Sequence, residues 1–212
     1  MRFSRESLKL YAVTDRHWLN GRRLADDVRA AVRGGASMVQ LREKELPHDE
    51  FKAEVMEIKA LCRELGVPFI VNDDAALAVE VDADGVHVGQ SDMEAGNVRA
   101  LIGSEKILGV SVRTPEEAAE AERKGADYLG AGAVFHTGSK SDAVDITHQA
   151  LREICAAVKI PVVAIGGITL RNARELSGSG IAGLAVISAI FAAPDVEAAS
   201  RELRALSEEI CG

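Results

Sequence analysis

The chain has 212 residues, of which 47% are hydrophobic, and its 33 acidic side chains outnumber 25 basic ones for a formal net charge of −8. This length and composition predict one globular domain over residues 1–212, because such a chain can bury roughly 70% of its unfolded surface around a single core. The acidic balance argues against nucleic acid as a partner, since binding it requires a basic surface. No window approaches the ~18 uncharged apolar residues of a membrane span, so no membrane partner is expected.

The N-terminal segment and the cysteines bear on the cellular compartment. Residues 1–6 lack the apolar core of a signal peptide. Cys62, Cys155 and Cys211 are odd in number and show no CxxC spacing, so neither a zinc site nor a disulfide framework is indicated. We expect reduced thiols in a cytoplasmic protein, with Cys62 and Cys155 packed as small apolar side chains of helices.

Eight short apolar runs alternate with longer segments of 3.6-residue periodicity, which predicts strands that alternate with helices. The predicted strands, in chain order, are residues 9–14, 38–42, 69–72, 85–89, 107–112, 128–135, 162–165 and 183–188. The predicted helices are residues 24–33, 49–65, 75–81, 93–102, 115–123, 148–157, 170–176 and 196–209. Thr114 and Pro115 are typical of a helix N-cap and of the first helical position.

This order of elements predicts a single-domain (β/α)8 TIM barrel, close to the lower size limit of that fold. The alternative is a doubly wound open sheet. Such a sheet usually carries a glycine-rich fingerprint after its first strand, and Thr14-Asp15-Arg16-His17 is not one. A barrel directs attention to the residues at the carboxyl ends of its strands.

The second predicted strand ends with two cations. Gln40, Arg42 and Lys44 share one face of the segment because successive strand residues alternate. Two cations inside a barrel mouth are costly unless they are paired or matched to an anion. They therefore form either an internal ion-pair layer with Asp15 or Asp73, or a site for a polyanion.

Two acids follow the third and fourth predicted strands. Asp73 and Asp92 would lie side by side at the barrel rim, where like charges repel unless a cation lies between them. Hard oxygen ligands with open positions suit Mg²⁺ bound jointly with a substrate phosphate. The alternative is that both acids cap the helices that follow, although Asp74 is the better cap candidate.

Two further segments have the composition of anion sites. The loop after strand six contains Thr137, Ser139 and Lys140, and it is either an anion-binding flap or a solvated polar loop. Gly166 and Gly167 after strand seven, with Ser188 after strand eight, match the position of the recurrent phosphate cradle of these barrels.

Two polar residues, Ser111 and His87, lie within predicted strands. Ser111 is predicted to point inward near the end of strand five, where by itself it is more typical of a satisfied core serine. His87 alternates with valines, which favours a hydrogen-bonded histidine of the barrel interior over a general base.

In this order, the sites resemble those of the thiamine-phosphate synthase family over nearly the whole chain. The phrases that carry the resemblance are Gln40-Leu41-Arg42-Glu43-Lys44, Val71-Asn72-Asp73-Asp74, Gly85-Val86-His87-Val88-Gly89-Gln90 with Asp92, Gly109-Val110-Ser111, Thr137-Gly138-Ser139-Lys140, and Ile165-Gly166-Gly167-Ile168 with Ser188-Ala189-Ile190. Each phrase is weak alone, and the ordered set is specific.

The resemblance implies a Mg²⁺-dependent transferase with two small-molecule substrates, a pyrimidine diphosphate and a thiazole phosphate, which releases pyrophosphate without a protein nucleophile. It assigns the pyrimidine diphosphate to Gln40, Arg42, Lys44, Asn72, Ser111 and Lys140. It assigns the thiazole phosphate to Thr137, Ser139, Gly167, Ile187 and Ser188. It gives Mg²⁺ to Asp73 and Asp92, and the catalytic set is Arg42, Lys44, Lys140 and Ser111. The sequence leaves a monomer and a homo-oligomer both open.

Two departures from the family pattern stand out. The family flap usually reads Pro-Thr-x-Thr-Lys, whereas this chain has His136 and Ser139 in place of the proline and the second threonine. Before strand eight, Ala182 stands where the family often has an acid. The alternatives are a thiazole tautomerase, which carries a histidine at a position that resembles Ala133, and a non-catalytic phosphate-binding barrel. Retention of both acids and the full set of cations disfavours both.

Overall fold

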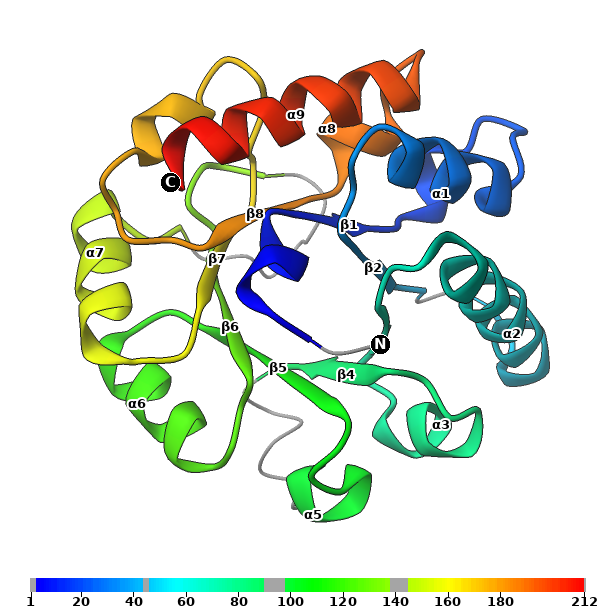
Figure 1. Ribbon diagram of the computed structural model, residues 1–212, viewed down its shortest axis with the longest axis horizontal. Helices are drawn as coiled ribbons and strands as arrows, with labels where there is room; N and C mark the ends of the chain where they lie inside the picture. The colour runs from blue at the N-terminus through cyan, green and yellow to red at the C-terminus, as the bar shows by residue number, and fades with distance from the viewer. Residues whose placement is uncertain (1–2, 44–45, 90–97, 138–144, 212) are drawn as a thin grey trace.

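A computed structural model describes residues 3–43, 46–89, 98–137 and 145–211 of the chain. Its eight parallel strands close into a barrel in the order β1 to β8, ringed by helices (Figure 1). The predicted (β/α)8 barrel is confirmed, and the open sheet is wrong because β1 pairs with β8. The strands are β1 (Leu10–Val13), β2 (Met38–Leu41), β3 (Phe69–Asn72), β4 (Gly85–Val88), β5 (Ile107–Val112), β6 (Tyr128–Gly132), β7 (Val162–Ile165) and β8 (Gly183–Val186).

Most helices lie where the periodicity predicts them, but one predicted helix is only a turn, and α8 (Ser188–Phe191) is an unpredicted helix that begins at Ser188, the last residue of the predicted strand 183–188. They are α1 (Leu24–Arg33), α2 (His48–Leu65), α3 (Ala75–Glu80), α5 (Val98–Ile102), α6 (Pro115–Arg123), α7 (His148–Ala157), α8 (Ser188–Phe191) and α9 (Val196–Ile210). Three short 3₁₀ turns join them: η1 (Arg5–Leu8), η2 (Arg16–Trp18) and η3 (Ala173–Leu176). None of the described helices is long and apolar enough to cross a membrane.

The predicted helix 170–176 is only the turn η3. The reason is local, because the side chain of Asn172 accepts a hydrogen bond from the Thr169 backbone N–H and donates one to the Gly167 carbonyl. Such side-chain bonds offer the backbone an alternative to helix. The predicted strand 128–135 also ends early, at Gly132. The predicted start of the helix 93–102 lies outside the described residues.

Alternation along each strand separates two apolar cores. Val39 and Leu41 of β2 belong to the cluster between barrel and helices, whereas Met38 of the same strand belongs to a smaller cluster inside the barrel with Ile70 and Val163. The side-chain period of a strand is two residues, so one strand serves both cores.

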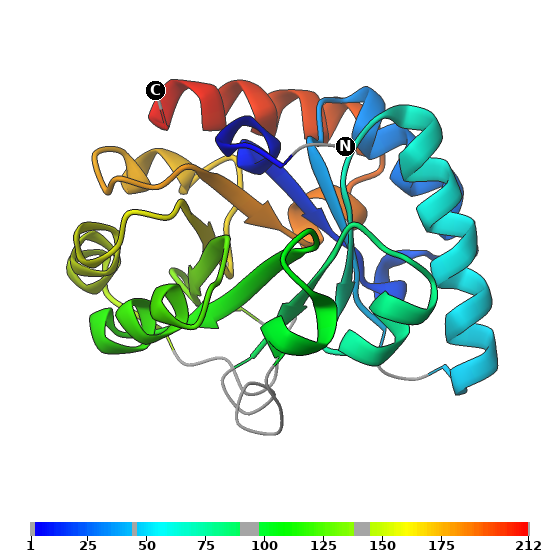
Figure 2. The same cartoon turned by 60° about the horizontal axis from the view of Figure 1, so that its bottom comes forward.

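The N-terminal segment closes the amino end of the barrel. Leu8 of η1 is fully buried in the inner cluster, and Phe3 packs against it with its ring 5.8 Å from that of Tyr128. The blue turn η1 covers the middle of the ring in Figure 1, and Figure 2 shows it on the same side as the red α9. The opposite end, where the strands terminate, carries the candidate site.

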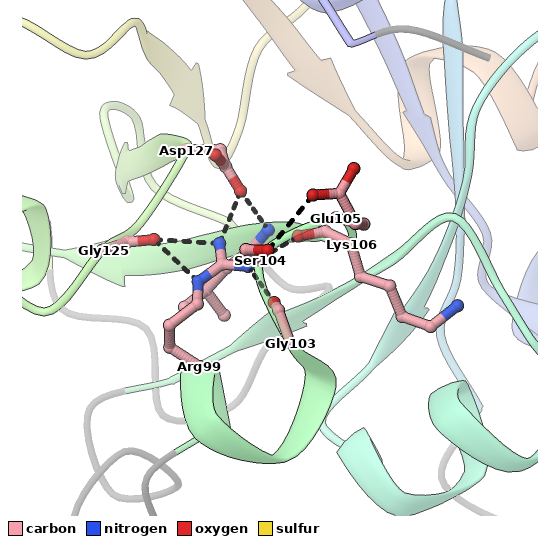
Figure 3. A network of polar contacts seen from close by, with 8 residues as sticks. Arg99, Gly103, Ser104, Glu105, Lys106, Gly125 and Asp127 are labelled. Atoms are coloured by element: carbon pink, nitrogen blue, oxygen red, sulfur yellow. Dashed lines mark hydrogen bonds and ion pairs between the residues drawn. The ribbon is translucent and has the colours of Figure 1, made fainter.

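Arg99 of α5 ties together the amino ends of β5 and β6 (Figure 3). Its guanidinium donates to the carbonyls of Gly103, Lys106 and Gly125 and, over 2.6 Å, to Asp127. The same Asp127 oxygen accepts the N–H of Leu108 at the second position of β5. The clamp thus joins α5, β5 and the turn before β6.

Side chains directly before β2, β4 and β6 repeat one role at this end. Ser37, before β2, accepts the N–H of Leu10, and Asp84, before β4, accepts the N–H of Phe69. Asp127, before β6, follows the same rule, as described above. These residues satisfy backbone donors at the base of the barrel, where an unpaired buried N–H is costly.

Candidate active site

The ends of β2 and β3 bring together three residues that the resemblance assigns to the pyrimidine diphosphate. Gln40 lies inside the barrel on β2 and is 3% exposed, and Arg42 directly follows that strand at the rim. Because Leu41 pairs with Val71, the next residues, Arg42 and Asn72, adjoin at the carboxyl end. Lys44 lies outside the described residues.

The guanidinium of Arg42 faces Asp15 in the loop after β1, with Nη1 and Oδ2 3.8 Å apart. Asp15 also accepts the backbone N–H of His17, so its charge is shared. The ion-pair alternative for Arg42 therefore has its partner. A contact of 3.8 Å is longer than the ~2.8 Å of a charge-assisted hydrogen bond, and it leaves the planar guanidinium with donors for an anion.

Asp73 follows β3 in a left-handed backbone conformation, with φ of 62°. One of its carboxylate oxygens accepts the side-chain N–H of Asn72 over 2.6 Å. The N-cap of α3 is Asp74, whose side chain accepts the Leu77 N–H. The capping alternative is therefore wrong for Asp73 and confirmed for Asp74.

The predicted metal site is only half within the described part of the chain, because Asp92 lies outside it. Among the described residues no group of three or more His, Cys, Asp or Glu side chains gathers as a metal site. Asp73 directly follows Asn72, the residue that adjoins Arg42, so one carboxylate and one cation come directly after the paired ends of β2 and β3. The assignment of Mg²⁺ to Asp73 and Asp92 stays a prediction.

A pocket lies over the ends of β7 and β8. Its lining includes four of the residues assigned to the thiazole phosphate: Thr137, Gly167, Ile187 and Ser188. Ser188 begins α8 and Ile187 is the residue before it. The structure therefore brings together residues from the loops after β6, β7 and β8, whereas Ser139 and Lys140 lie outside the described residues.

The glycine doublet of this pocket has a packing reason of its own. A Cβ on Gly166 would come within 2.5 Å of the Ala133 Cβ, and one on Gly167 within 2.5 Å of the His136 carbonyl oxygen. Both glycines also have positive φ, of 99° and 65°, which a side chain would strain. The doublet is thus required by the approach of the β6 loop, and the phosphate interpretation depends on the pocket and Ser188 instead.

A chain of hydrogen bonds crosses the barrel interior below the rim. Gln40 Nε2 donates to Tyr11 Oη over 2.6 Å, and Tyr11 Oη lies 2.7 Å from Tyr128 Oη. Tyr128 Oη lies 2.9 Å from His87 Nδ1, and His87 Nε2 lies 2.9 Å from Ser111 Oγ. The prediction of a hydrogen-bonded interior histidine is confirmed, and Ser111 points inward as expected.

The two tyrosines of this chain were missed by the sequence reasoning. Burial raises the pKa of both phenols well above the ordinary value, so they are neutral. The sequence did contain a signal, which is the glycine at position 109 inside the fifth strand. In the structure, a Cβ on Gly109 would lie 2.2 Å from the Tyr128 hydroxyl and 2.5 Å from His87 Nδ1. A glycine inside a strand often marks such a close approach.

A second group missed by the sequence reasoning lies beside the rim. Arg16 of η2 donates to Glu43, after β2, over 2.8 Å, and pairs closely with Glu54 of α2. The second carboxylate oxygen of Glu54 is buried and has no hydrogen-bond partner among the residues that the structure describes. Burial raises the pKa of Glu54, and the contact with Arg16 counteracts this only in part.

The position that would distinguish a tautomerase is filled by packing. Ala133 is buried beside Gly166 and its side chain is a methyl group, so this position carries no imidazole. His136, three residues further on, is 94% exposed on its side chain and lies 3.6 Å from Asp145. It is a rim residue with a loose acidic neighbour.

A closed barrel with a pocket and polar side chains at the carboxyl ends of its strands defines a (β/α)8 enzyme whose site is built on its βα loops. The family model described as "Thiamine monophosphate synthase" matches residues 10–190. The chain is 48% identical to the thiamine-phosphate synthase of Syntrophomonas wolfei over 200 residues, which are 94% of this chain and 96% of the relative. It is 50% identical to that of Moorella thermoacetica, over 92% of this chain and 93% of the relative.

A solved structure agrees. The thiamine phosphate pyrophosphorylase from Pyrococcus furiosus superposes with a TM-score of 0.89 at 46% identity, covering 98% of this chain and 99% of that one. This chain belongs to the thiamine-phosphate synthase family.

Proposed function

We propose that this chain condenses 4-amino-5-hydroxymethyl-2-methylpyrimidine diphosphate with 4-methyl-5-(2-hydroxyethyl)thiazole phosphate to give thiamine phosphate and pyrophosphate. The observation that carries the proposal is that residues of both predicted anion sites lie at one end of the barrel, Arg42 after β2 and the Ser188 pocket after β8. In a molecule of net charge −8, a cation such as Arg42 retained at that end favours anionic substrates.

The reaction breaks the bond between the pyrimidine methylene carbon and the diphosphate oxygen, and the electron pair leaves with pyrophosphate. The thiazole nitrogen then gives its lone pair to the methylene carbon. Arg42, with Lys44 and Lys140, stabilises the charge that develops on the leaving group. The Ser188 pocket holds the thiazole phosphate, so that its ring nitrogen faces the same carbon.

The donors at β3 fit a hard cation. Asp73 offers a carboxylate beside the Asn72 amide, and magnesium is usually held by one or two carboxylates together with waters and substrate phosphates. Asp73 and Asp92 would hold it. When bound, Mg²⁺ supplies positive charge to the departing diphosphate.

The small-molecule substrates are the proposed partners, and the cytoplasm is the proposed location. Cys62, Cys155 and Cys211 are all free thiols in the structure, and this supports a reducing compartment.

The test mixes the purified chain with both substrates and Mg²⁺ and follows thiamine phosphate and pyrophosphate. We expect both products in equal amounts, loss of turnover with a chelator, and a weaker Mg²⁺ dependence in Asp92→Asn. Lys140→Ala should reduce turnover more than affinity for the thiazole phosphate. Tight binding of the thiazole phosphate without any product would instead indicate a phosphate-binding barrel.

A further inference from the structure

The hydrogen-bond chain Gln40–Tyr11–Tyr128–His87–Ser111 joins two residues assigned to the pyrimidine diphosphate through three that are not. Its members come from β2, β1, β6, β4 and β5, so the chain spans the barrel. Gln40, Tyr11, Tyr128 and His87 are at most 7% exposed. Buried polar groups in such numbers are costly unless every one is satisfied.

The direction of the chain follows from counting protons. Each phenol has one hydrogen and two partners in the chain. Because Gln40 Nε2 donates to Tyr11, the Tyr11 hydrogen goes to Tyr128. The Tyr128 hydrogen then goes to His87 Nδ1. A neutral imidazole that accepts at Nδ1 carries its proton on Nε2, and this proton is donated to Ser111 Oγ.

The two ends of the chain are therefore coupled. With this direction, Gln40 can offer a ligand its Oε1 acceptor, and Ser111 can offer its hydroxyl hydrogen. A reversed chain would turn the Gln40 amide and leave Ser111 as an acceptor. Neither end can change its hydrogen-bonding role unless the three residues between them also change.

The depth of the chain indicates which part of the substrate it meets. Gln40 lies inside the barrel two residues before Arg42, which is at the rim. If Arg42 meets the diphosphate, the group deeper in the barrel is the pyrimidine ring. An acceptor at Gln40 matches the exocyclic amine of an aminopyrimidine, and it repels the carbonyl oxygen of an oxopyrimidine.

We propose that Tyr11, Tyr128 and His87 are positioning residues that fix Gln40 as an acceptor and Ser111 as a donor, and so select 4-aminopyrimidine over 4-oxopyrimidine diphosphates. This inference depends on the proposed function. It goes further by assigning specificity to three residues that the resemblance leaves without a role.

The barrel reserves space for this arrangement. A Cβ on Gly109 would overlap the Tyr128 ring, and one on Gly130 would lie 3.2 Å from His87 Cε1. Two adjacent strands thus give up side chains so that both rings can meet in the middle of the barrel. Tyr11 packs against Tyr128 edge to face at 5.7 Å, which fixes the phenols further.

The first experiment compares dissociation constants of the 4-amino and 4-oxo pyrimidine diphosphates for the wild type and for Tyr128→Phe, without thiazole phosphate. We expect the preference for the amino compound to fall by about tenfold or more in the variant. In a separate turnover assay with the 4-amino compound, the KM for the thiazole phosphate should be the same in the variant and the wild type.

Ile70→Val is the matched control, since Ile70 lies in the same inner cluster and makes no side-chain hydrogen bond. It should leave the preference unchanged. A Tyr128→Phe enzyme that folds and keeps the wild-type preference would overturn the inference. The proposed function fails in a different way, because the wild type would then form no thiamine phosphate.

A measurement on the unaltered protein covers the case in which the variant does not fold. Nitrogen NMR of the five histidines, assigned by single substitution of the other four, should show His87 as the neutral tautomer with its proton on Nε2. A proton on Nδ1 would contradict the direction of the chain.

Discussion

Arg99 at the amino end of the barrel and Arg42 at the carboxyl end are held by their partners in different ways. At the amino end, Arg99 donates to three carbonyls and to Asp127, with the ion pair at 2.6 Å. At the carboxyl end, Arg42 lies 3.8 Å from Asp15. A guanidinium with all its donors committed stabilises the fold, whereas one held at a distance keeps its capacity for a ligand. The comparison predicts that the stability of the fold depends more on the amino end of the barrel, and that the activity depends more on the rim at the carboxyl end.

Replacing Arg42 tests the rim. Arg42→Ala should lower kcat/KM for the pyrimidine diphosphate by about 10²–10³-fold, as the loss of one preorganised charge donor does in other enzymes. The midpoint of thermal unfolding should change little. Steady-state kinetics and a thermal melt on one preparation decide this, and a large loss of stability with unchanged kinetics would mean that Arg42 is a structural residue.

Replacing Arg99 tests the base. Arg99→Ala should reduce the free energy of unfolding by about 2–4 kcal/mol, because three carbonyls and one carboxylate lose their donor together. Urea unfolding measures the loss. Arg201→Ala is the control, since its pair with Glu197 is exposed on α9 and should contribute less than about 0.5 kcal/mol. Equal losses in the two variants would refute the contrast between clamp and surface pair.

Asp84 tests the smaller contribution of the polar side chains that directly precede β2, β4 and β6. Asp84→Ala removes the acceptor of the Phe69 N–H and should cost about 1–2 kcal/mol. Substitution of Glu202, which is exposed on α9, should have no measurable effect on the urea midpoint. If Asp84→Ala also leaves the urea midpoint unchanged, the prediction is wrong, and water replaces the carboxylate as the acceptor at the amino end of the barrel.

The pH dependence of thermal stability tests the buried Glu54, which pairs with Arg16 beside the rim. Since burial raises its pKa in the folded state, ionisation of Glu54 opposes folding at pH values above that pKa. The penalty disappears as the pH falls below the ordinary glutamate value. Glu54→Gln should therefore melt at or above the wild-type temperature at neutral pH, with the difference vanishing in acid. A Gln variant that is less stable at neutral pH would show that the Arg16 contact outweighs burial.

Much of the fold was predictable from local patterns. The ranges 24–33, 69–72, 107–112, 115–123, 148–157 and 162–165 agree residue for residue with the structure, since short apolar runs and 3.6-residue periodicity are local properties. Errors arose where a distant backbone or a single side chain intervened. Asn172 replaces a helix by a turn, and the close approach of the β6 loop at His136 explains Gly167, whose presence in the sequence suggests a phosphate site.

The sequence by itself determined the alternation of eight strands with helices, the direction of the Gln40 side chain into the barrel, and the family to which the chain belongs. Periodicity and motif order are properties of the sequence alone, which is why these features could be predicted. Only the tertiary structure decided that Asp15 is the partner of Arg42 and that Tyr11, Tyr128 and His87 join Gln40 to Ser111. Tyr11 and Tyr128 are 117 residues apart in sequence. Their contact exists because the barrel closes, and no local pattern contains that information.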